Sequence, residues 1–148
     1  MAGKLIILIG MSGSGKSTLA KAMIAKGLAD CYYEADMFMI DHAGHYKFEP
    51  TRLPYCHNMC ASRVNTAMSK GLTVIQSNTN LFRRDLESYF DDAKHYNYNV
   101  EIIKMPKYYK STHNVPARKL DAMKVNFNKI DLSNLPEHVK IVGFPSIT

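Results

Sequence analysis

The sequence lacks any long apolar run, and it has few cysteines. No hydrophobic stretch in the 148 residues approaches the roughly 20 that a membrane-spanning helix needs, so no membrane partner is expected. No secretory leader is expected either, because the sequence begins with a strand-like segment. The three cysteines, Cys31, Cys56 and Cys60, are an odd number and do not suggest a disulfide framework. These absences predict a reducing, cytoplasmic setting.

Internal repeats, linkers and low-complexity tracts are absent as well, which predicts one domain over residues 1–148. A hydrophobic content of 46% with 22% charged residues is typical of a globular chain. The formal net charge of +6 predicts a polyanionic partner, with nucleic acid, and DNA in particular, as the first candidate. Ordinary solubilising charge is the alternative, since charge balance is a weak signal.

What the chain does contain is a glycine-rich loop between a strand pattern and a helix pattern. Residues 10–18 read GMSGSGKST and match the phosphate-binding pattern G-x-x-x-x-G-K-[ST] at every required position. Residues 4–9, KLIILI, form an almost unbroken apolar run, typical of a strand that is buried on both faces. Residues 18–26 are rich in helix formers, and Gly27 is a stop signal. Strand, loop and helix together predict a site for a nucleoside triphosphate.

The residue types in this loop explain why it would bind phosphate. Glycines permit positive φ angles and a close approach of backbone N–H groups to a phosphate, aided by the positive end of the helix dipole. Lys16 would add a mobile charge for the γ-phosphate, and the Ser17 hydroxyl would ligate Mg²⁺. The predicted ATP-binding residues are Gly10, Met11, Ser12, Gly13, Ser14, Gly15, Lys16, Ser17 and Thr18.

Strand and helix patterns alternate along the whole chain. Strands are predicted at residues 4–9, 31–35, 72–76, 100–105 and 139–143, and helices at 18–26, 51–70, 81–95 and 116–130. This alternation predicts an α/β protein with the P-loop NTPase or kinase fold, a parallel sheet of about five strands and helices on both faces. Ligands of such sheets bind at the carboxyl ends of the strands. The glycine loop, Asp36 and residues 77–80 should therefore share one edge.

Several stretches together resemble one family. They are residues 10–18, Asp36 after the second strand, the pattern Tyr46-x-Phe48-x-Pro50-x-x-Leu53 with His57 and Cys60, and the run Ser77-Asn78-Thr79-Asn80. The chain resembles small P-loop kinases that include the kinase domain of bacteriophage polynucleotide kinase and the P-loop domain of NEDD4-binding protein 2-like proteins. The resemblance implies that Asp36 is the base for the acceptor hydroxyl, and a carboxylate near the γ-phosphate is what phosphoryl transfer to an alcohol requires.

Three departures from that family affect the acceptor side and the lid. Asn78 replaces an acidic residue, so it can hydrogen-bond but cannot take a proton. Met39 replaces an arginine that holds the substrate phosphate in the phage kinase. In the kinases that the chain resembles, a lid helix with arginines closes over the ATP phosphates. Here the segment between Met105 and Val115 contains no arginine, which leaves Lys110 and Arg118 as candidate lid cations, and Lys107 and Lys119 as further possible replacements.

Two further features, a pair of arginines and a pair of cysteines, each allow a functional and a purely structural interpretation. Arg83 and Arg84 would oppose the dipole of the helix they begin, which suggests an anionic ligand, but Arg83 could equally pair with Glu87 at i+4. The weaker candidates for substrate phosphate are Arg52 and Arg63. The spacing Cys56-His57-x-x-Cys60 could suggest zinc, but no second ligand pair exists and a buried helix face explains it as well.

The sequence therefore predicts an ATP- and Mg²⁺-dependent kinase that phosphorylates a hydroxyl of nucleic acid. Asp36 and Lys16 are the predicted catalytic residues, Asn78 and Thr79 join the arginines on the acceptor side, and Ser17 is the metal ligand. The acceptor would be a polynucleotide 5′-hydroxyl or a hydroxymethylated base in phage DNA, which would place the protein in a host cytoplasm. The alternatives are a kinase of a nucleoside or other small molecule, and an ATP-binding module without catalysis.

Overall fold

The computed structural model describes residues 3–11, 14–105 and 126–146. The strands are β1 (Lys4–Ile9), β2 (Cys31–Tyr33), β3 (Val74–Gln76), β4 (Asn99–Lys104) and β5 (Val139–Ile141). The α-helices are α1 (Lys16–Ala25), α2 (Leu53–Ser69) and α3 (Arg83–His95), and two short 3-10 helices are η1 (Ala35–Phe38) and η2 (Pro50–Arg52). Residues 126–129 are also helical. Among these residues, no helix combines the length and the apolar character needed to cross a bilayer.

The strands form one parallel sheet in the order β2-β3-β1-β4-β5. The central strand β1 pairs with β3 on one side and with β4 on the other, and every residue from Leu5 to Ile9 is buried because helices cover both faces. This explains why the sequence of β1 shows no polar alternation. The expected parallel five-stranded sheet is confirmed.

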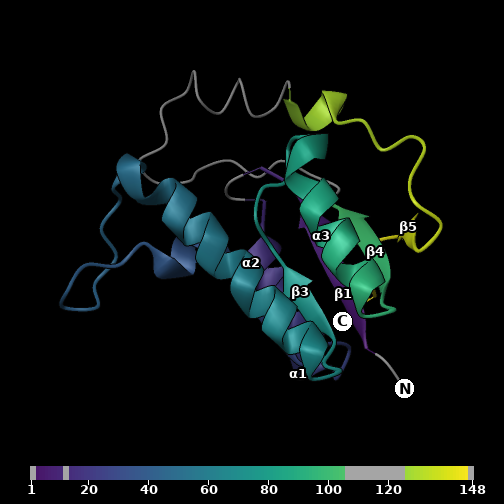
Figure 1. The fold of residues 1–148 in the computed structure, drawn as a ribbon, viewed down its shortest axis with the longest axis horizontal. Coiled ribbons are helices and arrows are strands. Elements are labelled where there is room, and N and C mark those ends of the chain that lie inside the picture. The colour runs from purple at the N-terminus through teal and green to yellow at the C-terminus, as the bar shows by residue number, and fades with distance from the viewer. Residues whose placement is uncertain (1–2, 12–13, 106–125, 147–148) are drawn as a thin grey trace.

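Helices cover both faces of the sheet, as the alternating pattern predicts (Figure 1). On one face α2 and α3 lie side by side, and Val64, Leu86 and Phe90 pack against inward-facing residues of β1 and β4. On the other face Leu19 and Met23 of α1 pack against Ile6 and Leu8 of the same strand β1. Successive residues of β1 thus serve two separate cores.

Each of the helices α1, α2 and α3 is followed by a residue with a positive φ angle, in the left-handed region of backbone space. Gly27 has φ +76°, and the N–H groups of Gly27 and Leu28 donate to the carbonyls of Ile24 and Met23. This is a Schellman motif, and it confirms Gly27 as the end of α1. The same pattern closes α2 at Gly71 and α3 at Asn97.

Some boundaries differ from the expected ones. The second strand ends at Tyr33 and not at residue 35, because the chain turns at once into η1. The helix expected from residue 51 begins as the 3-10 turn η2 and becomes α-helical at Leu53. Of the helix expected at 116–130, residues 116–125 lie outside the described residues.

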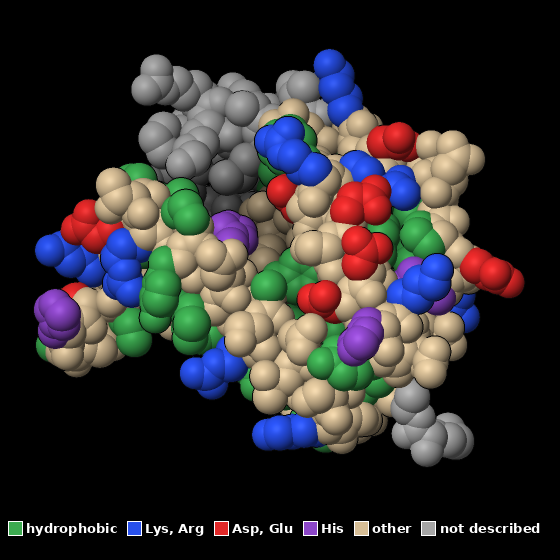
Figure 2. Space-filling model, viewed as in Figure 1, with side chains coloured by type: hydrophobic (Ala, Val, Ile, Leu, Met, Phe, Trp, Pro, Cys, Tyr) green, Lys and Arg blue, Asp and Glu red, His purple; other side chains and the backbone are tan. Residues whose placement is uncertain are grey.

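Residues 40–50 form an excursion that projects from the body of the protein beside α2 (Figure 1). An antiparallel bridge between Ile40 and Tyr46 and a hydrogen bond from Asp41 N to His45 O hold its turn together. Its surface mixes hydrophobic and charged side chains (Figure 2), and Tyr46 and Phe48 are 61% and 47% exposed. The excursion follows η1 directly and so begins close to Asp36.

Candidate functional site

The glycine loop leads from the carboxyl end of β1 into the N-terminus of α1. Gly15 has φ +89° and caps the helix, and Leu19 N donates to its carbonyl over 2.9 Å. A Cβ at Gly10 would lie 2.6 Å from Ser14 Oγ and 2.7 Å from Met105 Cγ, so these side chains would have to shift to admit one. Ser14 Oγ itself is buried without a hydrogen-bond partner among the described residues. An orphaned hydroxyl of this kind needs a ligand to complete it, which fits a loop built to receive phosphate oxygens.

The ammonium group of Lys16 lies against the loop that precedes it. Lys16 Nζ donates to the carbonyl oxygens of Gly10 and Met11 over 2.8 Å each, which leaves one of its three hydrogens. The side chain is buried, and burial lowers the pKa of Lys16 to about 8, although the charges of Glu34 and Asp36 oppose the shift. Lys16 is therefore a desolvated cation that contacts the loop and has two carboxylates in its neighbourhood.

Ser17 contacts a residue that the sequence did not single out. Its hydroxyl donates to the carboxylate of Glu34, at 3.1 Å to Oε2 and 3.3 Å to Oε1. Ser77, at the end of β3, donates its own hydroxyl to the same Oε2 over 3.1 Å. The first turn of α1 and the ends of β2 and β3 thus meet at one carboxylate. The only signal in the sequence was an acidic residue at the end of the second strand, two positions before the more familiar Asp36.

Asp36 is exposed and lies in η1, directly after β2. Its carboxylate is near enough to raise the pKa of Lys16, and to raise that of Tyr46 in the excursion. The backbone before it is fixed by Asn78, whose Oδ1 accepts a hydrogen bond from Ala35 N over 2.7 Å. The carboxylate is therefore turned toward solvent on the side of the glycine loop, and not into the core.

The run Ser77–Asn80 ties the glycine loop to β3. Gly10 N donates to Thr79 O over 3.1 Å, so Thr79 lies beside the start of the glycine loop. Asn80 is buried at φ +55°, and its Nδ2 donates to Leu8 O and to Gln76 Oε1. Asn78 uses both ends of its amide within the protein, because Nδ2 contacts Cys60 Sγ at 3.6 Å. The expectation that the loop, Asp36 and residues 77–80 share one edge is confirmed.

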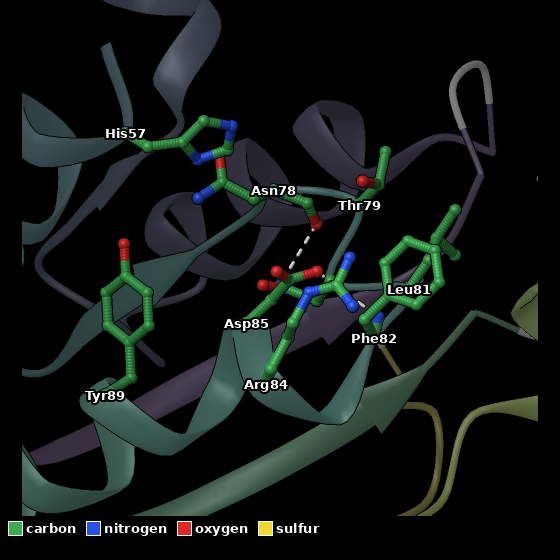
Figure 3. A pocket seen from close by; sticks show the side chains of 9 residues that line it. His57, Asn78, Thr79, Leu81, Phe82, Arg84, Asp85 and Tyr89 are labelled. Carbon is green, nitrogen blue, oxygen red and sulfur yellow. Dashed lines mark hydrogen bonds between the residues drawn. The ribbon is translucent and has the colours of Figure 1, made fainter. Parts of the chain in front are cut away.

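A cavity of about 290 Å³ opens between α2 and the start of α3 (Figure 3). His57 faces it from α2, Thr79 lines it from the loop after β3, and Arg84 borders it with a guanidinium 4.6 Å from the centre of the Phe82 ring. The remaining lining residues are Asn78, Asn80, Leu81, Asp85 and Tyr89. Sequence reasoning found Arg84 and Thr79 for the acceptor side, and it named His57 only in the family pattern and in the zinc alternative. It assigned no acceptor role to His57, Phe82 or Tyr89, which the packing of α2 and α3 brings to one cavity.

The four candidate arginines differ in their surroundings. Arg84 alone among them lines the cavity. Arg83 pairs with Glu87 at 2.8 Å, which is the i+4 ion pair that the sequence offered as an alternative. Its guanidinium also donates to the carbonyls of Asp131, Ser133 and Asn134. Arg52 Nη1 donates to Ile40 O, and Arg63 lies 5.8 Å from the centre of the Phe38 ring. The structure thus gives Arg83 and Arg52 structural partners and places only Arg84 at a hollow.

Other predicted residues fall outside the site or outside the described residues. Ser12 and Gly13 of the loop and the lid candidates Lys110 and Arg118 belong to the residues that the structure does not describe. Cys56 and Cys60 are fully buried and pack in the core between α2 and the sheet, as the helix-face reading expects. Burial raises the pKa of the Cys60 thiol.

A parallel β2-β3-β1-β4-β5 sheet with a glycine loop feeding α1 is the P-loop kinase fold. The family model described as an AAA domain (AAA_33) matches residues 5–107. Because that match covers more than half of the chain, the chain belongs to this family. The expected likeness to small P-loop kinases is confirmed.

Solved structures agree on the fold. A chain of the Pnkp1/Rnl/Hen1 RNA repair complex superposes with a TM-score of 0.70 at 19% identity, over 86% of this chain and 44% of that one. Kti12 of Chaetomium thermophilum in complex with ADP-AlF3 gives 0.66 at 10% identity, over 95% and 89%. The APS kinase CysC of Mycobacterium tuberculosis with AMPPNP and APS gives 0.53 at 13% identity, over 82% and 68%. The chain thus spans less than half of the RNA repair protein that it matches.

Proposed function

We propose that this protein transfers the γ-phosphate of ATP to a hydroxyl group of nucleic acid. The observation that supports it best is the arrangement at the carboxyl edge of the sheet. Lys16 contacts the phosphate loop, and the exposed carboxylate of Asp36 lies near enough to raise the pKa of that lysine against the effect of burial. A terminal phosphate held by Lys16 would then have a proton acceptor beside it, which is the requirement for phosphorylating an alcohol.

The residues have separate roles in this proposal. The N–H groups of the loop, the Ser14 hydroxyl and Lys16 hold the phosphates, and α1 directs its positive end at them. Asp36 accepts the proton of the acceptor hydroxyl as its oxygen attacks the γ-phosphorus, while the bond from phosphorus to ADP breaks. The Ser17 hydroxyl is the proposed ligand of Mg²⁺, which when bound neutralises charge on the phosphate oxygens. Lys110 and Arg118 remain proposed lid cations.

Three features support nucleic acid as the acceptor. The chain carries a net charge of +6. The excursion next to Asp36 exposes the rings of Tyr46 and Phe48, which suit stacking on bases, while its Lys47 pairs with Glu49 over 3.7 Å. A chain from an RNA repair complex is among the structural neighbours. Both a polynucleotide 5′-hydroxyl and a hydroxymethylated base meet this description.

A nucleoside or other small alcohol is the second candidate. The cavity of about 290 Å³ beside Thr79 has the size for a single small ligand, and it presents one cation, Arg84, and one imidazole, His57. The kinase CysC, solved with APS, is a structural neighbour with a small acceptor. In this version the excursion would have no part in acceptor binding.

The test offers γ-labelled ATP with 5′-hydroxyl oligonucleotides, hydroxymethyl-base DNA and nucleosides in parallel. We expect label in one of the two nucleic acids and a loss of about 10²- to 10⁴-fold in Asp36→Asn. The matched control is Asp41→Asn, which removes a carboxylate from the excursion beyond Asp36. Label in nucleosides alone would support the second candidate. ATP binding without transfer to any alcohol would reduce the protein to a nucleotide-binding module.

A further inference from the structure

The carboxylate of Glu34 is held by hydroxyls from two other segments, and the proposed transfer step gives it no task of its own. Ser17 donates to it from the first turn of α1, and Ser77, only 1% exposed, donates from the end of β3. Glu34 itself lies at the end of β2 in extended backbone, with φ −142° and ψ 153°. Its side chain therefore bridges from one strand end to the helix that carries the phosphate loop.

Electrostatics makes this position costly once a triphosphate is bound. The carboxylate contacts the hydroxyl of the residue that directly follows Lys16, so it lies beside the place where phosphate oxygens are expected. Lys16 is the nearby cation, but two of its hydrogens are used by the carbonyls of Gly10 and Met11. A carboxylate and phosphate oxygens at close range repel each other strongly in a partly buried site unless a cation lies between them.

We infer that Glu34 is the carboxylate of the protein's magnesium site and shares the ion with Ser17, while Ser77 orients the carboxylate. The inference rests on the proposed function only in that ATP is the ligand. Mg²⁺ takes oxygen ligands, keeps several waters and commonly uses one or two protein groups beside substrate phosphates, so a hydroxyl and one carboxylate suffice. Asp36, which is exposed and lies two residues further on, then stays available for the acceptor.

The test compares ATP binding by calorimetry in EDTA and in excess MgCl₂. Wild-type protein should bind ATP more tightly with Mg²⁺. Glu34→Gln should bind ATP in EDTA at least as tightly as wild type, because a repelling charge is gone, but should lose about tenfold or more of the gain from Mg²⁺. A carboxylate that only supported the fold would weaken binding in both buffers, so the opposite signs separate the two roles.

Two further variants complete the experiment. Asp36→Asn removes an equal charge two residues away and should keep the full gain from Mg²⁺, while Ser77→Ala should lose part of it. An unchanged Mg²⁺ gain in Glu34→Gln would overturn the inference, as would an equal loss of that gain in Asp36→Asn. Failure of wild-type protein to phosphorylate any alcohol would refute the proposed function but leave these binding results standing, so the two failures are distinguishable.

Discussion

Asn78 Oδ1 accepts a hydrogen bond from Ala35 N over 2.7 Å, which joins the end of β3 to the residue just before Asp36. Ala35 is 6% exposed, so its N–H has no ready replacement partner in water. Asn78→Ala should therefore cost about 1–3 kcal/mol in the free energy of unfolding and lower kcat more than ATP affinity. Urea unfolding and steady-state kinetics measure the two effects.

Asn78→Asp is the matched control for that prediction. It keeps an oxygen in the same place, so the position of Asp36 and most of the turnover should be retained. Equal damage from Ala and Asp at position 78 would show that the amide, through its Nδ2 contact with Cys60, is what matters.

The lowered pKa of Lys16 predicts a pH dependence of ATP binding. Burial lowers the pKa of Lys16 from 10.5 to about 8, and phosphate oxygens favour the protonated amine. Above pH 8 the free protein has lost this proton and must regain it to bind, so the Kd for ATP should rise by up to about tenfold per pH unit. Calorimetry between pH 7.5 and 9.5 tests this, with Lys4→Met as the control. A flat profile contradicts it.

The lowered pKa of Lys16 also affects folding stability, which should rise with pH, whereas ATP affinity should fall. Between pH 8 and 10.5 the unfolded chain still binds the Lys16 proton that the folded protein has released. The slope of the free energy of unfolding with pH is therefore positive for this group, and its contribution should rise through that window. Lys16→Met, compared with wild type by urea unfolding at pH 8 and pH 10, should lack this rise.

Tyr46 is 61% exposed in the excursion and lies near Asp36. If nucleic acid is the acceptor, Tyr46→Ala should raise the KM for a single-stranded oligonucleotide, because stacking on a ring contributes about 1–3 kcal/mol per base. Tyr46→Phe keeps the ring and should retain the KM. Activity that is insensitive to both substitutions and to salt would favour a small acceptor.

Arg83 and Arg84 are neighbours in sequence with different expected effects. Arg83→Ala removes the pair with Glu87 and the bonds to three carbonyls near residue 133, so it should lower thermal stability and leave acceptor KM nearly unchanged. Arg84→Ala should raise acceptor KM and leave stability within about 0.5 kcal/mol, since Arg84 is exposed at the cavity. A reversed pattern would remove Arg84 from the acceptor site.

Two of the glycines with positive φ allow a test of backbone strain alone. Gly27 and Gly71 both have φ +76°, and a Cβ at either would meet nothing within 4 Å. Gly→Ala at either position should cost about 1–2 kcal/mol from conformation only. Gly143→Ala, with equal space and no positive φ, is the control and should be nearly neutral. At Gly3 the Cβ would lie 2.6 Å from the backbone of Leu72, so the cost there should be larger.

Much of this architecture follows from local patterns in the sequence. The almost unbroken apolar run of residues 4–9 predicts a strand buried on both faces, and Gly27 ends α1 because its backbone takes a positive φ. The residues of the phosphate-binding motif are contiguous, so the nine residues 10–18 are enough to predict the loop from the sequence. For the same reason Asp36 and residues 77–80 could be placed at one edge, since parallel strands bring their carboxyl ends together.

Tertiary structure alone decided which polar groups meet at that edge. Glu34 contacts Ser17 and Ser77 across 17 and 43 residues of sequence, and no local pattern distinguishes it from an ordinary strand-end glutamate. Arg83 and Arg84 read alike in sequence, yet one is used by carbonyls about 50 residues away and the other borders a cavity. Contacts of this kind depend on how the strand ends align and on how α1 and α3 pack on the sheet, and that arrangement is set by the whole core.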